Sequence, residues 1–102
     1  MVNIIIYLNN SEDAEKLALD LLKLKLVAHA SIDVDNNSYV FDGEIKKEKN
    51  FVVTVQTKGL LFTAIEEHVN ENYPYKVKIF SMPITQSNAA FFDYMVEHSV
   101  KI

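Results

Sequence analysis

Two histidines carry the most specific chemistry in this 102-residue chain. His29 falls in a segment that alternates like a strand, and His68 falls in a segment with helical spacing. The chain has no cysteine, which excludes thiolate ligands, cysteine nucleophiles and disulfides. Neutral imidazole is a good ligand for copper, zinc and nickel. We therefore take His29 and His68 as candidate metal ligands that need further ligands from another subunit; the alternative is two partly buried histidines with ordinary hydrogen bonds.

A second candidate site surrounds Pro74, where a rigid turn follows the second helical segment. The side chains beside this proline and those at the end of the preceding strand are expected to line a small-ligand pocket between subunits. The alternative is that the proline and tyrosines only pack an intersubunit corner. Lys76 and Lys78 alternate along one strand face, which is either solvated or attracts an anion. The expected pocket residues are Gln56, Lys58, Tyr73, Tyr75 and Lys76.

The sequence lacks residues that calcium binding and catalysis would require. Residues 33–44 match the spacing of a calcium-binding loop, but Ser38 replaces the glycine of the sharp turn, and strand patterns flank the loop where an EF-hand requires helices. The sequence contains no nucleophile elbow, no glycine-rich phosphate loop and no His-x-x-x-His pair. We expect a binding protein that is not an enzyme.

Composition restricts the partners. The net charge is -4 and no arginine is present, so a nucleic acid or an anionic membrane surface is not an expected partner. Residues 1–102 form one domain, and nearly half of them are hydrophobic. No apolar run has the length of a membrane span and no secretory signal pattern is present, so we expect a cytoplasmic protein.

The elements that must position these residues are clearest in the second half of the chain. Residues 51–56 alternate as a strand, and residues 57–59 break the pattern. Apolar residues at helical spacing then predict a helix that must end by Tyr73, because Pro74 follows it. A strand at residues 77–83 and a helix at residues 88–100 complete this half.

The first half has a parallel organisation. We expect a strand at residues 2–8, a helix at residues 12–25 and a second strand at residues 26–34. A polar turn at residues 33–38, a strand at residues 38–45 with a bulge or bend at Asp42-Gly43, and a charged turn at residues 46–50 are expected next. The order predicts an α+β protein: a ferredoxin-like βαββαβ sandwich, with an antiparallel sheet, both helices on one side of it and a C-terminal helix.

A set of short motifs occurs in a fixed order along the chain. Those in the central segment are Thr57 to Phe62, Ala64, Glu66-Glu67 and Tyr73-Pro74-Tyr75. Those outside it are Ala14 to Ala18, Lys25-Leu26, Tyr39 with Phe41, and Met82-Pro83-Ile84. In their order and spacing these motifs resemble the CutA family of divalent-cation tolerance proteins, across nearly the whole chain. The resemblance implies a homotrimer of ferredoxin-like subunits, in which a long bent hairpin pairs with strands of neighbours. It also implies a role in divalent-ion tolerance, with copper or another divalent cation as the ligand.

The chain departs from the family pattern at polar positions, which makes it a divergent member. Tyr73 stands where the family has histidine, and Lys76 stands where it has glutamate. His29 and His68 occupy positions where some members carry metal-linked cysteines. A rival interpretation is a PII-like regulatory module, which shares the trimeric plan and binds a nucleotide or another small anion between subunits; its lysines would be Lys58, Lys76 and Lys78.

Overall fold

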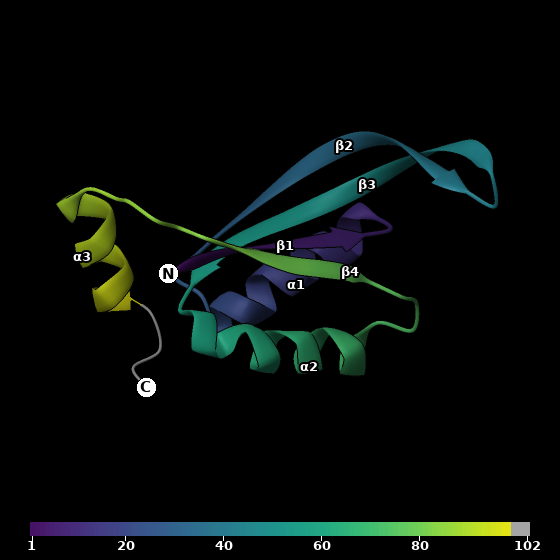
Figure 1. Cartoon of the computed structure of the whole chain (residues 1–102). Coiled ribbons are helices and arrows are strands. Elements are labelled where there is room, and N and C mark those ends of the chain that lie inside the picture. The colour runs from purple at the N-terminus through teal and green to yellow at the C-terminus, as the bar shows by residue number, and fades with distance from the viewer. Residues whose placement is uncertain (99–102) are drawn as a thin grey trace.

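The structure is a computed structural model that describes residues 1–98. A four-stranded sheet carries two helices on one of its faces, and a third helix stands beside the sheet (Figure 1). The elements in chain order are β1 (Val2–Leu8), α1 (Ser11–Lys23), β2 (His29–Phe41), β3 (Glu44–Thr57), a 3-10 turn (Gly59–Leu61), α2 (Phe62–Asn72), β4 (Lys78–Pro83) and α3 (Ala89–His98).

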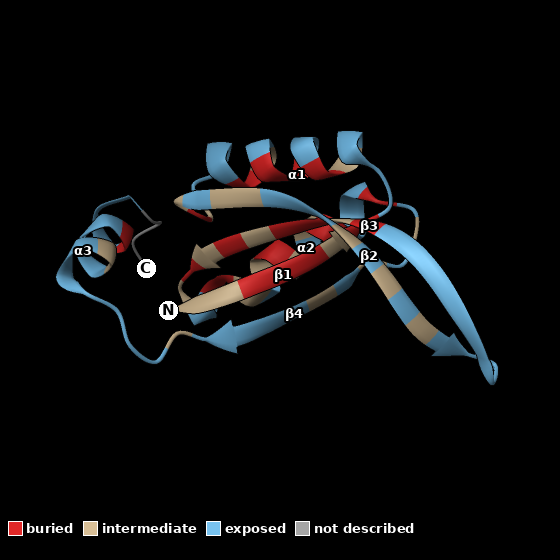
Figure 2. Cartoon of the chain, turned by 90° about the horizontal axis from the view of Figure 1, so that it is seen from above, coloured by how far each residue is buried: buried red, intermediate tan, exposed pale blue. Residues whose placement is uncertain are grey.

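The sheet confirms the expected fold. Its strand order is β2-β3-β1-β4, and every neighbouring pair is antiparallel. This order places β1 and β3 in the centre and leaves β2 and β4 as the edges. α1 and α2 lie side by side on the same face (Figures 1 and 2), as the ferredoxin-like sandwich requires.

The core lies between the sheet and these two helices. Alternate residues of β1 and β3 face the helices, and each helix supplies apolar residues at helical spacing. Completely buried members of this layer are Ile4, Ile6, Leu8, Leu17, Leu21, Val53, Val55 and Ile65. The remaining residues of the central strands, such as Asn3, Tyr7 and Gln56, point to the opposite side, which we call the open face.

The segment between α1 and α2 differs from the sequence prediction. The polar turn expected at residues 33–38 lies inside β2, and the charged turn expected at residues 46–50 lies inside β3, so the two strands form one long hairpin. The hairpin extends past the helix layer (Figure 1), so most polar side chains there meet solvent on both faces of the ribbon at little cost. Asn50 is an exception, because it is only 8% exposed.

Asp42-Gly43, where a bulge or bend was expected within a strand, is the turn of the hairpin between β2 and β3. Both residues have positive φ, 52° at Asp42 and 75° at Gly43. Two consecutive positive φ values define the turn whose twist matches paired strands, and Asp-Gly is a preferred sequence for it. The second strand also begins later than expected, at His29, because residues 24–28 close α1 and lead into the strand.

The ends of α1 follow from local capping. The Asn10 side chain accepts a hydrogen bond from the Asp13 backbone N–H at 2.8 Å, which satisfies one free donor of the first turn. At the other end Lys25 adopts a φ of 58°, and Leu26 N–H donates to the Leu21 carbonyl at 3.1 Å. This left-handed closure ends α1 at Lys23, two residues before the predicted end.

The last helix begins close to its predicted start. The Asn88 side chain accepts a hydrogen bond from the Phe91 N–H at 3.0 Å and thereby caps α3. The Tyr94 hydroxyl donates to the Ala28 carbonyl at 3.1 Å, which attaches α3 to the segment before β2. The predicted helix continued to residue 100, and its last two residues lie outside the described part of the chain.

Candidate functional site

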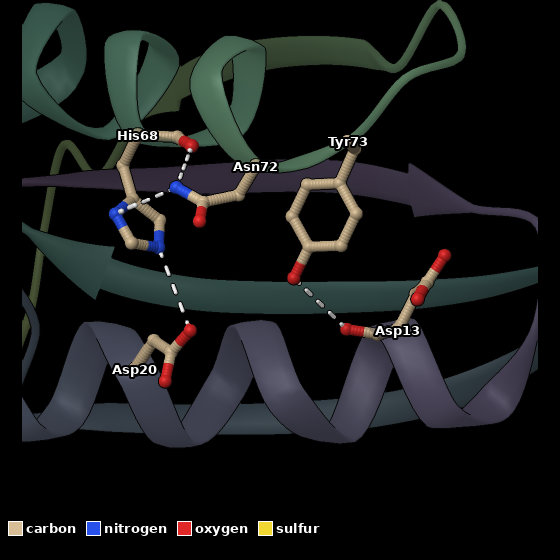
Figure 3. A network of polar contacts seen from close by, with 5 residues as sticks. All are labelled: Asp13, Asp20, His68, Asn72 and Tyr73. Atoms are coloured by element: carbon tan, nitrogen blue, oxygen red, sulfur yellow. Dashed lines mark hydrogen bonds and ion pairs between the residues drawn. The ribbon is translucent and has the colours of Figure 1, made fainter.

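A polar contact between the two packed helices brings one predicted histidine next to a carboxylate. His68 projects from α2 toward α1, and its Nε2 lies 3.7 Å from Asp20 Oδ2 (Figure 3). The two side chains are 18% and 28% exposed, so both are largely withdrawn from solvent. His68 Nε2 is itself buried and has no hydrogen-bond partner among residues 1–98. A buried, unbonded nitrogen facing a carboxylate is costly unless a proton or a cation joins the two.

Asn72 fixes the other side of the imidazole. Its side-chain Nδ2 donates to the His68 carbonyl at 2.7 Å and lies 3.5 Å from His68 Nδ1 (Figure 3). Because Asn72 is four residues after His68, the two side chains share one face of α2. The Asn72 amide therefore lies on the Nδ1 side of the ring, and Nε2 faces Asp20 on the opposite side (Figure 3).

His29 lies in a different layer. It is exposed at the start of β2, and its Nδ1 lies 3.0 Å from Gln56 Oε1. Gln56 Nε2 donates in turn to Asn3 Oδ1 at 2.9 Å, so a polar row crosses β2, β3 and β1 on the open face. One subunit therefore does not bring His29 and His68 together. Within residues 1–98, no three His, Asp or Glu residues are grouped closely enough to hold a metal ion.

The five residues of the expected pocket occupy two ends of the subunit. Gln56 and Lys58 precede α2, whereas Tyr73, Tyr75 and Lys76 follow it. The 11 residues of α2 separate the two groups by roughly 16 Å along the helix axis. Within one chain these groups cannot line the same small pocket, so a shared pocket would need two subunits.

The two tyrosines join the segment after α2 to the start of α1. The Tyr75 hydroxyl donates to Asp13 Oδ2 at 2.6 Å, and the Tyr73 hydroxyl donates to the Asp13 carbonyl at 3.3 Å. Burial, together with the negative charges of Asp13 and Asp20, raises the pKa of Tyr73 to about 12. Burial and the bond to Asp13 also raise the pKa of Tyr75. Both hydroxyls therefore stay protonated at neutral pH and act as hydrogen-bond donors.

Lys76 lines a different cavity, of about 400 Å³, beneath the bent hairpin. Sequence reasoning placed Lys76 and Lys78 on one strand face but missed the residues that approach them from the hairpin, because these are adjacent only after the hairpin bends. The other lining residues are Tyr7, Asn9, Asn37, Ser38, Tyr39, Glu48, Asn50 and Phe80.

The fold and this geometry define a small ferredoxin-like protein with a histidine and a carboxylate facing each other between its helices. The model of the CutA1 divalent ion tolerance protein family matches residues 2–98. The chain therefore belongs to the CutA1 divalent ion tolerance family.

Curated relatives agree with this membership. The divalent-cation tolerance protein CutA of Pyrococcus horikoshii is 28% identical over 91 residues, which cover 88% of this chain and 89% of the relative. The chloroplastic protein CutA of Arabidopsis thaliana is 27% identical over 97 residues, which cover 91% of this chain but 53% of the longer relative.

Solved structures share the whole fold. CutA1 from Pyrococcus horikoshii superposes with a TM-score of 0.87 at 24% identity and covers 99% of this chain and 100% of its own. The periplasmic divalent cation tolerance protein CutA from Archaeoglobus fulgidus gives a TM-score of 0.84 at 27% identity, covering 96% and 98%. Relatives are thus named for the chloroplast and the periplasm. In residues 1–98 of this chain, no helix is long and apolar enough to cross a membrane.

Proposed function

We propose that this protein acts in divalent metal-ion tolerance as a homotrimer, and that it binds a divalent cation such as copper or zinc through His68 and Asp20. The observation that carries this proposal is the buried His68 Nε2, which lies 3.7 Å from Asp20 Oδ2 without a hydrogen-bond partner in residues 1–98. His29 is the second candidate ligand. Its exposed imidazole would need ligands from a neighbouring subunit. The proposed role is binding without catalysis, and the cytoplasm is its proposed location.

The distance fits a bridging cation better than a hydrogen bond. Zinc binds histidine nitrogen and carboxylate oxygen at ~2.0–2.2 Å, so tetrahedral geometry puts the two ligand atoms about 3.3–3.6 Å apart. The observed 3.7 Å would close to this range with a small side-chain rotation. A cation on Nε2 leaves the ring proton on Nδ1, so the Asn72 amide would turn its oxygen toward that proton. Water or a second subunit would complete the coordination.

The proposed trimer is supported by apolar surface that a single subunit leaves uncovered. Phe80 and Met82, on the open face, are 42% and 46% exposed. Val40, Phe41 and Ile45 near the end of the hairpin are more than half exposed. Both β2 and β4 are edge strands, so along one side of each no neighbouring strand is found within residues 1–98. Contact with strands of neighbouring copies would cover the edges and the apolar side chains together.

Calorimetric titration with Zn(II) and Cu(II) tests the metal site. We expect His68→Gln and Asp20→Asn each to weaken binding by about tenfold or more, since each removes one of two protein ligands. The matched control is His98→Gln, which removes an exposed histidine whose Nε2 also lies near a carboxylate, 4.0 Å from Glu97 Oε2. This control should bind as the parent does.

Three results would speak against the site. They are no binding by the parent protein, equal loss in His68→Gln and His98→Gln, or loss only in His29→Gln. The last result would assign the cation to His29 instead. Light scattering on the same samples measures the assembly, and a stable monomer would remove the trimer proposal.

A further inference from the structure

We infer that Asn72 is a latch on the proposed cation site, because its amide holds His68 in the form that cannot bind a cation through Nε2. The inference rests on the proposed function and adds a regulating residue to it. Asn72, His68 and Asp20 all lie in α1 and α2, on the side of the sheet opposite the open face (Figure 3). The latch therefore works within one subunit and uses no surface of the open face or of the edge strands.

The backbone carbonyl of His68 decides which end of the Asn72 amide faces the ring. The atom 2.7 Å from this carbonyl oxygen must be a hydrogen-bond donor, so it is the amide nitrogen Nδ2 and not the amide oxygen. The same nitrogen lies 3.5 Å from His68 Nδ1 (Figure 3). Because it carries two hydrogens, one can point to the carbonyl and the other to the ring. The backbone of α2 thus places a donor beside Nδ1.

A donor beside Nδ1 selects the tautomer of the ring. In a neutral imidazole one nitrogen carries the proton and the other accepts a hydrogen bond. With the Asn72 N–H beside it, Nδ1 is the acceptor, and the ring proton lies on Nε2, the atom 3.7 Å from Asp20 Oδ2. Asp20 favours the same form, since its carboxylate attracts a proton on that nitrogen. A protonated Nε2 has no lone pair for a cation, so this tautomer is the closed form of the site.

Opening the site costs the contact between Asn72 and the backbone. When Nε2 binds a cation, the ring proton is on Nδ1, where it meets the Asn72 N–H. If the amide turns its oxygen toward this proton, the oxygen also replaces the nitrogen beside the His68 carbonyl, and two acceptors face each other. If the amide leaves for solvent instead, the 2.7 Å bond is lost. By either route the amide weakens cation binding.

This cost sets the cation concentration at which the site fills. The apparent dissociation constant equals the intrinsic constant divided by the fraction of molecules in the open form. One net hydrogen bond changes that fraction by about fivefold, which corresponds to ~1 kcal/mol at 25 °C. The latch therefore shifts the filling of the site to a higher concentration of cation.

Asn72→Ala removes the latch and leaves both proposed ligands, His68 and Asp20, in place. We expect this variant to bind Zn(II) about fivefold more tightly than the parent in calorimetric titration. The alternative role for Asn72 is to support the bound imidazole, and loss of such a support weakens metal binding by about 10–100-fold. The two roles thus predict changes of opposite sign. Asn70→Ala is the matched control: it makes the same substitution at an exposed position on another face of α2 and should bind as the parent does.

NMR of the imidazole nitrogens in the metal-free protein, at pH 8, where a free imidazole is neutral, tests the closed form without any cation. We expect the Nε2–H tautomer of His68 in the parent. An Nδ1–H tautomer would overturn the inference, as would unchanged or weaker Zn(II) binding by Asn72→Ala, or equal tightening in Asn70→Ala. These results leave the proposed site of His68 and Asp20 standing. Absence of Zn(II) binding from the parent and both variants is the distinct outcome that overturns the proposed site and the latch with it.

Discussion

The buried tyrosine after α2 makes the stability of this protein sensitive to alkaline pH. The pKa of Tyr73 rises from 10.0 to about 12 because its hydroxyl is withdrawn from water and lies near Asp13 and Asp20. In the unfolded chain the same group ionises near its ordinary pKa of about 10. Between these two values the unfolded state loses a proton that the folded state keeps, so the free energy of unfolding falls as the pH rises.

The size of this effect follows from the pKa difference. Each unit corresponds to about 1.36 kcal/mol, so a rise from 10.0 to about 12 contributes at most ~2.7 kcal/mol of stability. This contribution is complete below pH 10 and is lost as the pH rises to about 12. Tyr73→Phe cannot ionise, and it loses only the 3.3 Å hydrogen bond to the Asp13 carbonyl, which costs about 0.5–1.5 kcal/mol at neutral pH.

Urea unfolding at a fixed protein concentration, at several pH values from 8 to about 11.5, measures the difference between parent and variant. We expect Tyr73→Phe to be the less stable protein at pH 8 and to approach or exceed the parent above pH 11. Val69→Ala, a destabilising core variant that keeps the tyrosine, should remain below the parent by a constant amount. A constant gap for Tyr73→Phe across the whole range would refute the reasoning.

Two further predictions concern single backbone and side-chain contacts. Lys25→Gly should raise the free energy of unfolding by about 0.5–1 kcal/mol, because Lys25 has a φ of 58° that glycine adopts without strain. A lower melting temperature for this variant would contradict the proposed role of Lys25 at the end of α1. Thr57→Val should lower the free energy of unfolding by about 1–3 kcal/mol. The fully buried Thr57 hydroxyl donates a 2.6 Å hydrogen bond to the Leu26 carbonyl, and the substitution leaves that carbonyl without this donor. Thermal and urea unfolding measure both changes, and an unchanged midpoint for Thr57→Val would show that the hydroxyl adds no stability.

Hydrophobic periodicity was sufficient to predict the elements that pack against each other. The strand at residues 2–8 and the helix that ends before Pro74 have apolar residues on one face, and the structure buries those faces. Periodicity was misleading in the hairpin, where residues 33–38 and 46–50 lie beyond the helix layer and have no single buried face. The Asp42-Gly43 pair was the available signal for one continuous hairpin, since that dipeptide specifies a two-residue turn.

The candidate sites were less predictable, because each depends on contacts between distant segments. The type of residue identified His68, but its carboxylate neighbour Asp20 lies 48 positions earlier, and only the packing of α1 on α2 brings them together. The alternation of Lys76 and Lys78 indicated a basic strand face. The aromatic and amide walls opposite that face come from the bend of the hairpin, which no local pattern specifies.

The position of the proposed metal site determines how it is coupled to assembly. His68 and Asp20 lie between two helices of one subunit. A cation bound there would therefore stabilise the folded chain whether or not neighbouring copies cover the open face.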